Sequence, residues 1–134
     1  MAAKNKSPNI NMTLTPLIVD DSSAIRKILQ RALRQAISPV GEIYEASDGI
    51  EALSVLESQQ ISFVLSDINM PNMDGLQLLS EIKSRPQFKD LPVIMITTEG
   101  SQARVLEAIK LGAAGYVRKP FTPEQIKEKL VGIV

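Results

Sequence analysis

Five short apolar segments recur along the chain, and each is closed by polar or turn-forming residues. They cover residues 17–19, 42–46, 62–66, 93–97 and 115–119. In the third segment Phe63, Val64 and Leu65 are consecutive, as expected for a central parallel strand that is covered on both faces. The second segment instead alternates polar and apolar residues, which is typical of an edge strand. We therefore predict five strands.

A stretch with helical periodicity follows each of these strands. After the first strand, apolar residues three and four positions apart form a single face, which comprises Ile25, Ile28, Leu29, Ala32 and Leu33. The apolar positions of the fourth helix are Val105, Leu106 and Ile109. The last helix is predicted to begin after Thr122 as its N-cap and to bury Ile126 and Leu130.

Strands that alternate with helices favour one architecture. Such a chain forms a parallel sheet with right-handed crossovers and with helices on both faces. The predicted fold class is therefore α/β, a doubly wound parallel sheet in a three-layer sandwich. A chain of 134 residues suffices for one domain. We place this domain at residues 15–134, after a polar segment, residues 1–14, that we predict to be a flexible tail.

Composition argues against several classes of function. Fifteen basic and fifteen acidic residues give zero formal net charge, which disfavours nucleic-acid binding. The chain has no cysteine for disulfides and no histidine, the commonest general base and zinc ligand. No apolar run approaches the ~18 residues of a membrane span, and the N-terminus lacks the apolar segment of a signal peptide. We therefore expect a cytoplasmic protein without a membrane or nucleic-acid partner.

Four of the five predicted strands end in a residue that can bind an ion or a phosphoryl group. These residues are Asp20 and Asp21 after the first strand, Asp67 after the third, and Thr97 and Lys119 at the ends of the fourth and fifth. The carboxyl ends of parallel strands lie on one edge of the sheet, where such folds bind ligands. Carboxylates ~4 Å apart repel one another by about 1 kcal/mol per pair in water, and by several times more near a protein surface.

A divalent cation would neutralise this acidic cluster. A few carboxylate oxygens suit Mg²⁺, with Mn²⁺ as a substitute. Asp67 is then a candidate nucleophile toward a phosphoryl group, and the Lys119 ammonium and Thr97 hydroxyl are candidates for binding its oxygens. Each residue alone has a simpler interpretation: Asp20 and Asp21 as a helix cap, and Lys119 as a solvated charge. Their coincidence on one edge favours a phosphoryl site.

Four segments of the sequence carry distinctive motifs. They are residues 18–22, 67–75, 96–97 and 115–121. Together they resemble the receiver domain of two-component response regulators, and the resemblance extends over residues 16–134. It implies the flavodoxin-like strand order 2-1-3-4-5. It also implies a cis peptide bond between Lys119 and Pro120, an arrangement found in about one X–Pro bond in twenty.

The resemblance implies a role for each site residue. Asp67 is the phosphoacceptor in this comparison. The implied magnesium ligands are Asp20, Asp21, Asp67 and the backbone carbonyl of Asn69. Thr97 and Lys119 become the switch residues that contact the phosphoryl group, and Tyr116 becomes the aromatic partner of the switch.

Within the family, the chain is similar to the stand-alone chemotaxis regulators of the CheY type. Asn69, two residues after the acceptor, and Glu99, two after the switch threonine, resemble a pair that is associated in that subgroup with fast loss of the phosphoryl group. The chain departs from the subgroup at the start of the fourth helix, where Ser101 and Gln102 stand in place of lysines.

The resemblance implies a single-domain response regulator, which is a signalling protein rather than an enzyme. A histidine kinase of the CheA type would donate the phosphoryl group, in agreement with the absence of histidine here. Output would be phosphorylation-dependent binding of a protein such as the flagellar switch, with a phosphatase as a further partner and the chain itself a monomer. A stand-alone receiver in another two-component pathway, or in a phosphorelay, is the nearest alternative.

Two alternatives belong to other classes of protein. A Mg²⁺-dependent phosphohydrolase of the haloacid dehalogenase type, with an aspartyl nucleophile, usually carries a second acid two residues later as proton donor. Here that residue is Asn69, which does not transfer a proton at neutral pH. A nucleotide- or flavin-binding module would need an amide-lined phosphate loop after the first strand, where this chain has the acidic Asp20 and Asp21.

Overall fold

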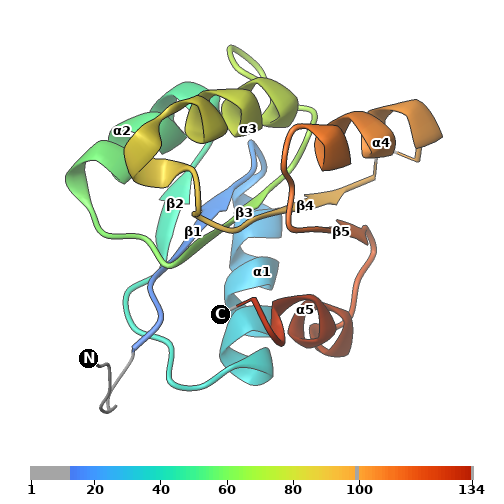
Figure 1. Ribbon diagram of the computed structural model, residues 1–134. Coiled ribbons are helices and arrows are strands. Elements are labelled where there is room, and N and C mark those ends of the chain that lie inside the picture. Colours follow the sequence, from blue (N-terminus) through green and yellow to red (C-terminus); the bar gives the residue numbers. More distant parts are fainter. Residues whose placement is uncertain (1–12, 99, 134) are drawn as a thin grey trace.

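One parallel sheet of five strands forms the centre of the molecule (Figure 1). The computed structural model describes residues 13–98 and 100–133. The strands are β1 (Pro16–Val19), β2 (Tyr44–Ala46), β3 (Phe63–Ser66), β4 (Val93–Thr97) and β5 (Gly115–Arg118). Their order is β2-β1-β3-β4-β5, and neighbouring strands are parallel throughout. The flavodoxin-like order that the family resemblance implied is confirmed.

Helices cover both faces of this sheet. They are α1 (Ser23–Ala36), α2 (Gly49–Ser58), α3 (Gly75–Ser84), the 3-10 helix η2 (Pro86–Phe88), α4 (Gln102–Lys110) and α5 (Pro123–Leu130). In Figure 1, α1 and α5 lie on one side of the sheet, and α2, α3 and α4 lie on the other. The predicted three-layer sandwich is therefore confirmed.

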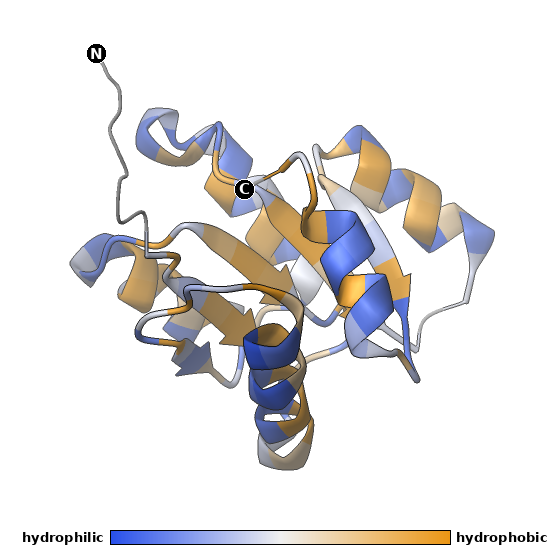
Figure 2. Cartoon of the chain, turned by 90° about the horizontal axis from the view of Figure 1, so that it is seen from below, coloured by the Kyte–Doolittle hydropathy of each residue, from blue (hydrophilic) through white to orange (hydrophobic). Residues whose placement is uncertain are grey.

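Alternate residues of the strands contribute to two separate hydrophobic cores. Leu17 and Val64 belong to the core shared with α2 and α3, whereas Ile18 and Leu65 belong to the core shared with α1 and α5. Because β1 and β3 lie inside the sheet, all of their residues are buried. Figure 2 shows the consequence, since the central strands carry mostly hydrophobic colours while the helices carry both.

Each α-helix begins at a side chain that caps its first turn. The N-cap residues are Ser22, Asp48, Asp74, Ser101 and Thr122, and each accepts a hydrogen bond from the backbone N–H three residues later. Such a cap satisfies a donor that has no partner inside the helix and contributes about 1 kcal/mol. The predicted cap of the last helix is confirmed. Ser22, rather than Asp20 or Asp21, caps α1, so those two acids are available to another role.

The apolar face predicted for the first helix is wrong in part, and apolar residues of the fourth helix are exposed. Ile28 is 48% exposed, and Leu106 and Ile109 are 51% and 57% exposed. Ile28 lies at the margin of the α1 face, whose buried residues are Leu29, Ala32, Leu33 and Ala36. In α4, which is described over its whole length, only Ala108 is buried. Successive helical residues lie about 100° apart, so Leu106 points away from the side that Ala108 buries.

Two of the predicted features fall on residues outside the described ranges. Residues 1–12 of the predicted tail and Glu99 lie outside them. The described chain begins at Thr13, and Leu14 pairs with Val40 in an isolated parallel bridge. None of the helices in the described part of the chain is long and apolar enough to cross a membrane.

Candidate functional site

The carboxyl edge of the sheet gathers the residues that the sequence analysis singled out. Asp20 and Asp21 follow β1, and Asp67 follows β3. Thr97 is the last residue of β4, and Lys119 follows β5. Because the strands share one direction, these positions share one edge. Carboxylate oxygens of the three aspartates lie within 4.8 Å of one another, so the predicted acidic cluster is present.

Lys119 connects two of these carboxylates. Its Nζ atom donates to Asp20 Oδ2 at 2.7 Å and to Asp67 Oδ2 at 3.2 Å, and its side chain is 11% exposed. Burial alone lowers the pKa of this ammonium, but the hydrogen bond to Asp20 and the charges of both carboxylates outweigh burial and raise it. Lys119 is therefore a cation at neutral pH. The bond to Pro120 is cis, as the resemblance implied, and a second cis bond, Ser38–Pro39, was not predicted.

Backbone hydrogen bonds fix the two inner carboxylates. Asp20 N–H donates to the Ala46 carbonyl at 3.1 Å, and Asp67 N–H donates to the Val19 carbonyl at 2.9 Å. Asp20 Oδ1 accepts the Ser22 N–H at 2.9 Å, and Asp67 Oδ1 accepts the N–H of the residue after it at 2.7 Å. In each carboxylate, one oxygen is held by the backbone and the other is turned toward Lys119.

Burial concentrates the negative charge of this cluster. Asp20 is 1% exposed and Asp67 is 9% exposed, whereas Asp21 faces solvent. The Lys119 ammonium contacts two of the three clustered carboxylates, and charges withdrawn from water are costly unless they are paired. An all-oxygen donor set with an exposed side matches a hard divalent cation that keeps part of its water shell. The residues present therefore fit a magnesium site.

The remaining predicted residues lie around this cluster. Thr97 is fully buried, and its carbonyl accepts the Lys119 N–H at 3.0 Å. Tyr116 is half-buried on β5 and packs against the core on the side of α2 and α3. Asn69 is exposed in the β3–α3 loop. The structure therefore brings Asp20, Asp21, Asp67 and Lys119 together. Thr97 is joined to this group by the hydrogen bond from the Lys119 N–H to its carbonyl.

Sequence reasoning missed a residue that supports the cluster from outside. The Arg26 guanidinium in α1 donates from Nη1 to the Asp20 carbonyl at 2.6 Å and from Nε to Glu45 at 2.8 Å. It therefore ties the segment after β1 to β2. The sequence signal is weak, because an arginine on the polar face of a predicted helix is common and its partner lies 19 residues away.

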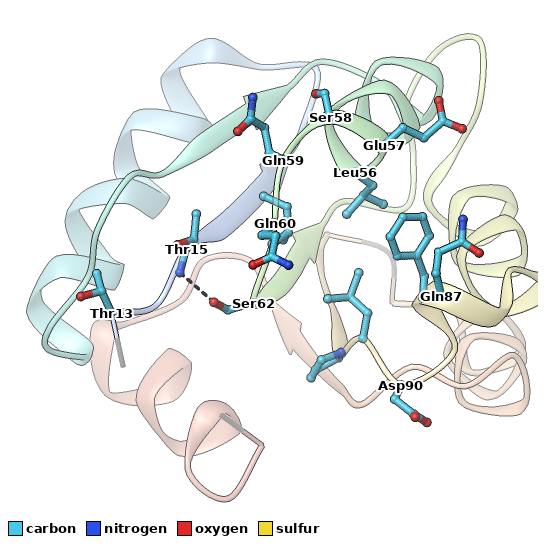
Figure 3. Close-up of a pocket in the computed structure, with 14 residues that line it drawn as sticks. Thr13, Thr15, Leu56, Glu57, Ser58, Gln59, Gln60, Ser62, Gln87 and Asp90 are labelled. Atoms are coloured by element: carbon cyan, nitrogen blue, oxygen red, sulfur yellow. Dashed lines mark hydrogen bonds between the residues drawn. The ribbon is translucent and has the colours of Figure 1, made fainter. Parts of the chain in front are cut away.

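A separate hollow lies at the amino edge of the sheet. It measures about 870 Å³ and is lined mainly by residues that precede β1, β3 and β4, together with the end of α2 and the η2 region (Figure 3). In it, Thr15 N–H donates to Ser62 Oγ at 2.8 Å. Its two acids, Glu57 and Asp90, do not belong to any group of three or more potential metal ligands among the described residues. Side-chain chemistry, rather than concavity, therefore identifies the carboxyl edge as the site.

A flavodoxin-like sheet with an acidic cluster at its carboxyl edge defines an α/β domain with a candidate cation site. Comparison with known proteins identifies its family. Residues 17–131 match the family model of the response regulator receiver domain. The chain therefore belongs to the family of response regulator receiver domains. Receiver domains of this type are signalling proteins rather than classical enzymes.

Chemotaxis proteins are among the relatives of this chain. It is 39% identical over 119 residues to a chemotaxis protein CheY homolog from Campylobacter jejuni, covering 88% of this chain and 90% of the relative. It is 45% identical over 117 residues to chemotaxis protein CheY1 of Helicobacter pylori, covering 85% and 91%. The structure of Vibrio cholerae CheY4 aligns with a TM-score of 0.81 at 34% identity, covering 91% and 99%. The chain is therefore a receiver domain of the CheY type, which associates it with two-component signalling.

Proposed function

We propose that this chain is a single-domain response regulator that accepts a phosphoryl group on Asp67 in a Mg²⁺-dependent reaction. The observation that carries the proposal is the position of the Lys119 ammonium, 3.2 Å from Asp67 Oδ2 within a cluster of three carboxylates. A fixed ammonium beside the acceptor oxygen stabilises the charge of an incoming phosphoryl group.

Asp67 has one carboxylate oxygen suited to attack. Oδ1 accepts the Ile68 N–H at 2.7 Å, whereas Oδ2 faces Lys119. In the proposed transfer from a phosphohistidine, Oδ2 attacks phosphorus, the O–P bond forms, and the P–N bond breaks with its electron pair leaving on the imidazole. The product is an acyl phosphate. Lys119 then donates its hydrogen bond to a phosphoryl oxygen in place of the carboxylate oxygen.

Four residues are the proposed ligands of Mg²⁺, or of Mn²⁺ as a substitute: Asp20, Asp21, Asp67 and Asn69 through its backbone carbonyl. When bound, the ion offsets the charge of the carboxylates and of the phosphoryl oxygens. The amide side chain of Asn69 stands where a haloacid-dehalogenase-type phosphohydrolase has its proton donor. This residue therefore favours a phosphoacceptor over that enzyme.

Thr97 and Tyr116 are the proposed switch residues. We expect the Thr97 hydroxyl to bind a phosphoryl oxygen, and Tyr116 to occupy the space that Thr97 vacates. This change is a population shift, because the phosphoryl group acts only through contacts that differ between two states. Asn69 and Glu99 are proposed to set the lifetime of the phosphoryl group.

The proposed partners are proteins, and neither nucleic acid nor a membrane is among them. A histidine kinase of the CheA type donates the phosphoryl group, and the flagellar switch receives the signal. The names of the relatives, which are chemotaxis proteins, support chemotaxis as the pathway. A phosphatase is a further partner, and the chain acts as a cytoplasmic monomer. The exposed Leu106 and Ile109 of α4 offer apolar contact area. Ser101 and Gln102, also exposed, are the residues at which partner choice would differ from lysine-bearing relatives.

Phosphorylation by acetyl phosphate tests the assignment of Asp67. With Mg²⁺ present, intact-mass spectrometry should show the purified protein gaining one phosphoryl group, and Asp67→Asn should abolish this gain. Asp90→Asn, which alters an exposed acid at the opposite edge, is the matched control and should behave as the wild type. A phosphoryl group retained by Asp67→Asn would disprove the site.

A capture experiment tests the pathway. The protein activated with beryllofluoride and Mg²⁺ is compared as bait with the same protein without them. Preferential recovery of a flagellar switch protein supports chemotaxis. Recovery of a phosphotransfer protein or of another regulator in its place indicates a phosphorelay or a different two-component pathway.

A further inference from the structure

The loop between β3 and α3 contains a strained turn. The Met73 N–H donates to the Pro71 carbonyl at 2.7 Å, which closes a three-residue turn around Asn72. Asn72 has φ of 66°, the only positive φ of a non-glycine residue in the described chain. Such a backbone conformation is uncommon, although asparagine tolerates it better than most residues, and it persists only where neighbouring contacts hold it.

The side chain of Asn72 supplies one of these contacts. Its Nδ2 atom donates to Asp48 Oδ2 at 2.7 Å, across 24 residues of sequence. Asp48 is itself fixed, because its Oδ1 accepts the Glu51 N–H at 2.8 Å and caps α2. The pKa of Asp48 is lowered by this N–H and by the Asn72 side chain, so the carboxylate is ionised at neutral pH and accepts both bonds.

A second contact ties the same loop to the β2–α2 turn. The Gly49 N–H donates to the Met73 carbonyl at 3.0 Å. A Cβ atom at Gly49 would lie 2.5 Å from Met73 Cγ, so only a glycine allows this approach. Asn72 and Met73, neighbours in the loop, are therefore held by Asp48 and Gly49, neighbours in the turn.

The residue that ends β2, just before this turn, is bonded to the backbone of Asp20, which belongs to the carboxylate cluster. The Ala46 carbonyl, two residues before Asp48, accepts the Asp20 N–H at 3.1 Å. The segment 46–49 is therefore bonded both to the acid that follows β1 and to the loop that follows β3. It sets the separation of the two chain segments between which the proposed cation lies.

We propose that Asp48 and Asn72 are positioning residues for the proposed cation site. Asn69 lies in the loop between Asp67, whose carboxylate is hydrogen-bonded, and Asn72, which is hydrogen-bonded to Asp48. The Asp48–Asn72 hydrogen bond therefore determines the position of the Asn69 carbonyl. This inference rests on the proposed phosphoryl-accepting function. Neither residue touches the phosphoryl group, so the bond affects the concentration of Mg²⁺ that the reaction requires and leaves the chemical step itself unchanged.

Two variants test this role. Asn72→Gly accepts the positive φ but removes the hydrogen bond, whereas the double variant Asp48→Asn with Asn72→Asp restores the bond with donor and acceptor exchanged. Asn72→Gly should raise the Kd for Mg²⁺, measured by calorimetry, by about three- to tenfold. The Mg²⁺ concentration for half-maximal phosphorylation by acetyl phosphate should rise by the same factor. The rate at saturating Mg²⁺ should stay within about twofold of the wild type, and the double variant should recover most of the lost affinity.

Lys83→Met, near the amino edge of the sheet, provides the control for stability. It leaves the Leu91 carbonyl without its donor, and it should lower the melting temperature while the Kd for Mg²⁺ stays unchanged. An unchanged Kd in Asn72→Gly, or a double variant as weak as the single one, would overturn the positioning role. If the wild type itself bound no Mg²⁺ at its acids, the proposed function would fail together with this inference. The wild-type measurement thus separates the two failures.

Discussion

Two lysines, one near each edge of the sheet, differ in the charge of their hydrogen-bond partners. At the carboxyl edge, Lys119 donates to the carboxylates of Asp20 and Asp67 at 2.7 and 3.2 Å. Near the amino edge, Lys83 of α3 donates to the backbone carbonyl of Leu91 at 2.6 Å. Burial lowers the pKa of Lys83, whereas the carboxylates overcome burial and raise the pKa of Lys119. One lysine completes backbone hydrogen bonding, and the other offsets an excess of negative charge.

The acids of the two edges differ in the same way. Near the amino edge, Glu57 is exposed and pairs with Arg85 at 2.8 Å, so its charge is both hydrated and balanced. At the carboxyl edge, the Lys119 ammonium contacts two of the three clustered carboxylates, and those two, Asp20 and Asp67, are almost fully buried. Burying negative charge without enough positive charge beside it costs free energy, which a bound cation would offset. Unbalanced charge is therefore the better indicator of the site, although a hollow of about 870 Å³ lies at the amino edge.

Replacing each lysine by methionine should give the largest difference between the edges. Lys119→Met removes the cation beside the acceptor oxygen, and phosphorylation by acetyl phosphate should slow by about 10²- to 10³-fold. Lys83→Met leaves the Leu91 carbonyl without its donor, so the free energy of unfolding should fall by about 1–3 kcal/mol while phosphorylation stays at the wild-type rate. Stopped reactions analysed by mass spectrometry give both rates. Equal losses of rate in the two variants would remove the distinction.

A substitution at the opposite end of β3 should separate stability from chemistry. Phe63, the first residue of this strand, is fully buried, and Asp67 follows the last. Phe63→Ala should lower the free energy of unfolding by about 3–5 kcal/mol, because it removes buried area and leaves a cavity. Urea unfolding followed by circular dichroism measures this loss. The protein that remains folded should be phosphorylated at the wild-type rate, and a rate reduced as strongly as in Lys119→Met would show that the edges are not independent.

Strand direction explains why the carboxyl edge was predictable from the sequence. The apolar run before Asp67 marks a buried strand, and the residue after such a run lies at the carboxyl end. Helices between strands require parallel pairing, which brings the ends of different strands together. The positions of Asp20, Thr97 and Lys119 follow from the same argument. These positions follow from local patterns of apolar residues and from the rule that strands connected by helices are parallel.

Contacts between distant segments were not predictable in this way. The Asp48–Asn72 hydrogen bond joins residues 24 apart, and each residue alone is an ordinary turn or cap former. Likewise, the apolar pattern of α4 did not indicate that Leu106 faces solvent. Periodicity shows which residues share a side of a helix, whereas the packing of neighbouring elements decides which side is covered.

The smallest expected effect concerns the pH dependence of Asp48, an acid of the carboxyl edge whose partners are neutral. Its pKa is lowered by the Glu51 N–H and the Asn72 amide. The unfolded state therefore binds more protons than the folded state at acidic pH, so the contribution of Asp48 to stability is present above its unfolded pKa and is lost as the pH falls. Asp48→Asn keeps a good helix cap without the charge, and it should cost about 0.3–1 kcal/mol at pH 7. In urea titrations this difference should diminish as the pH falls below the ordinary pKa of an aspartate, and it should vanish once the folded-state carboxylate is protonated. A difference at Asp48 that persisted unchanged in strong acid would show that its charge contributes nothing.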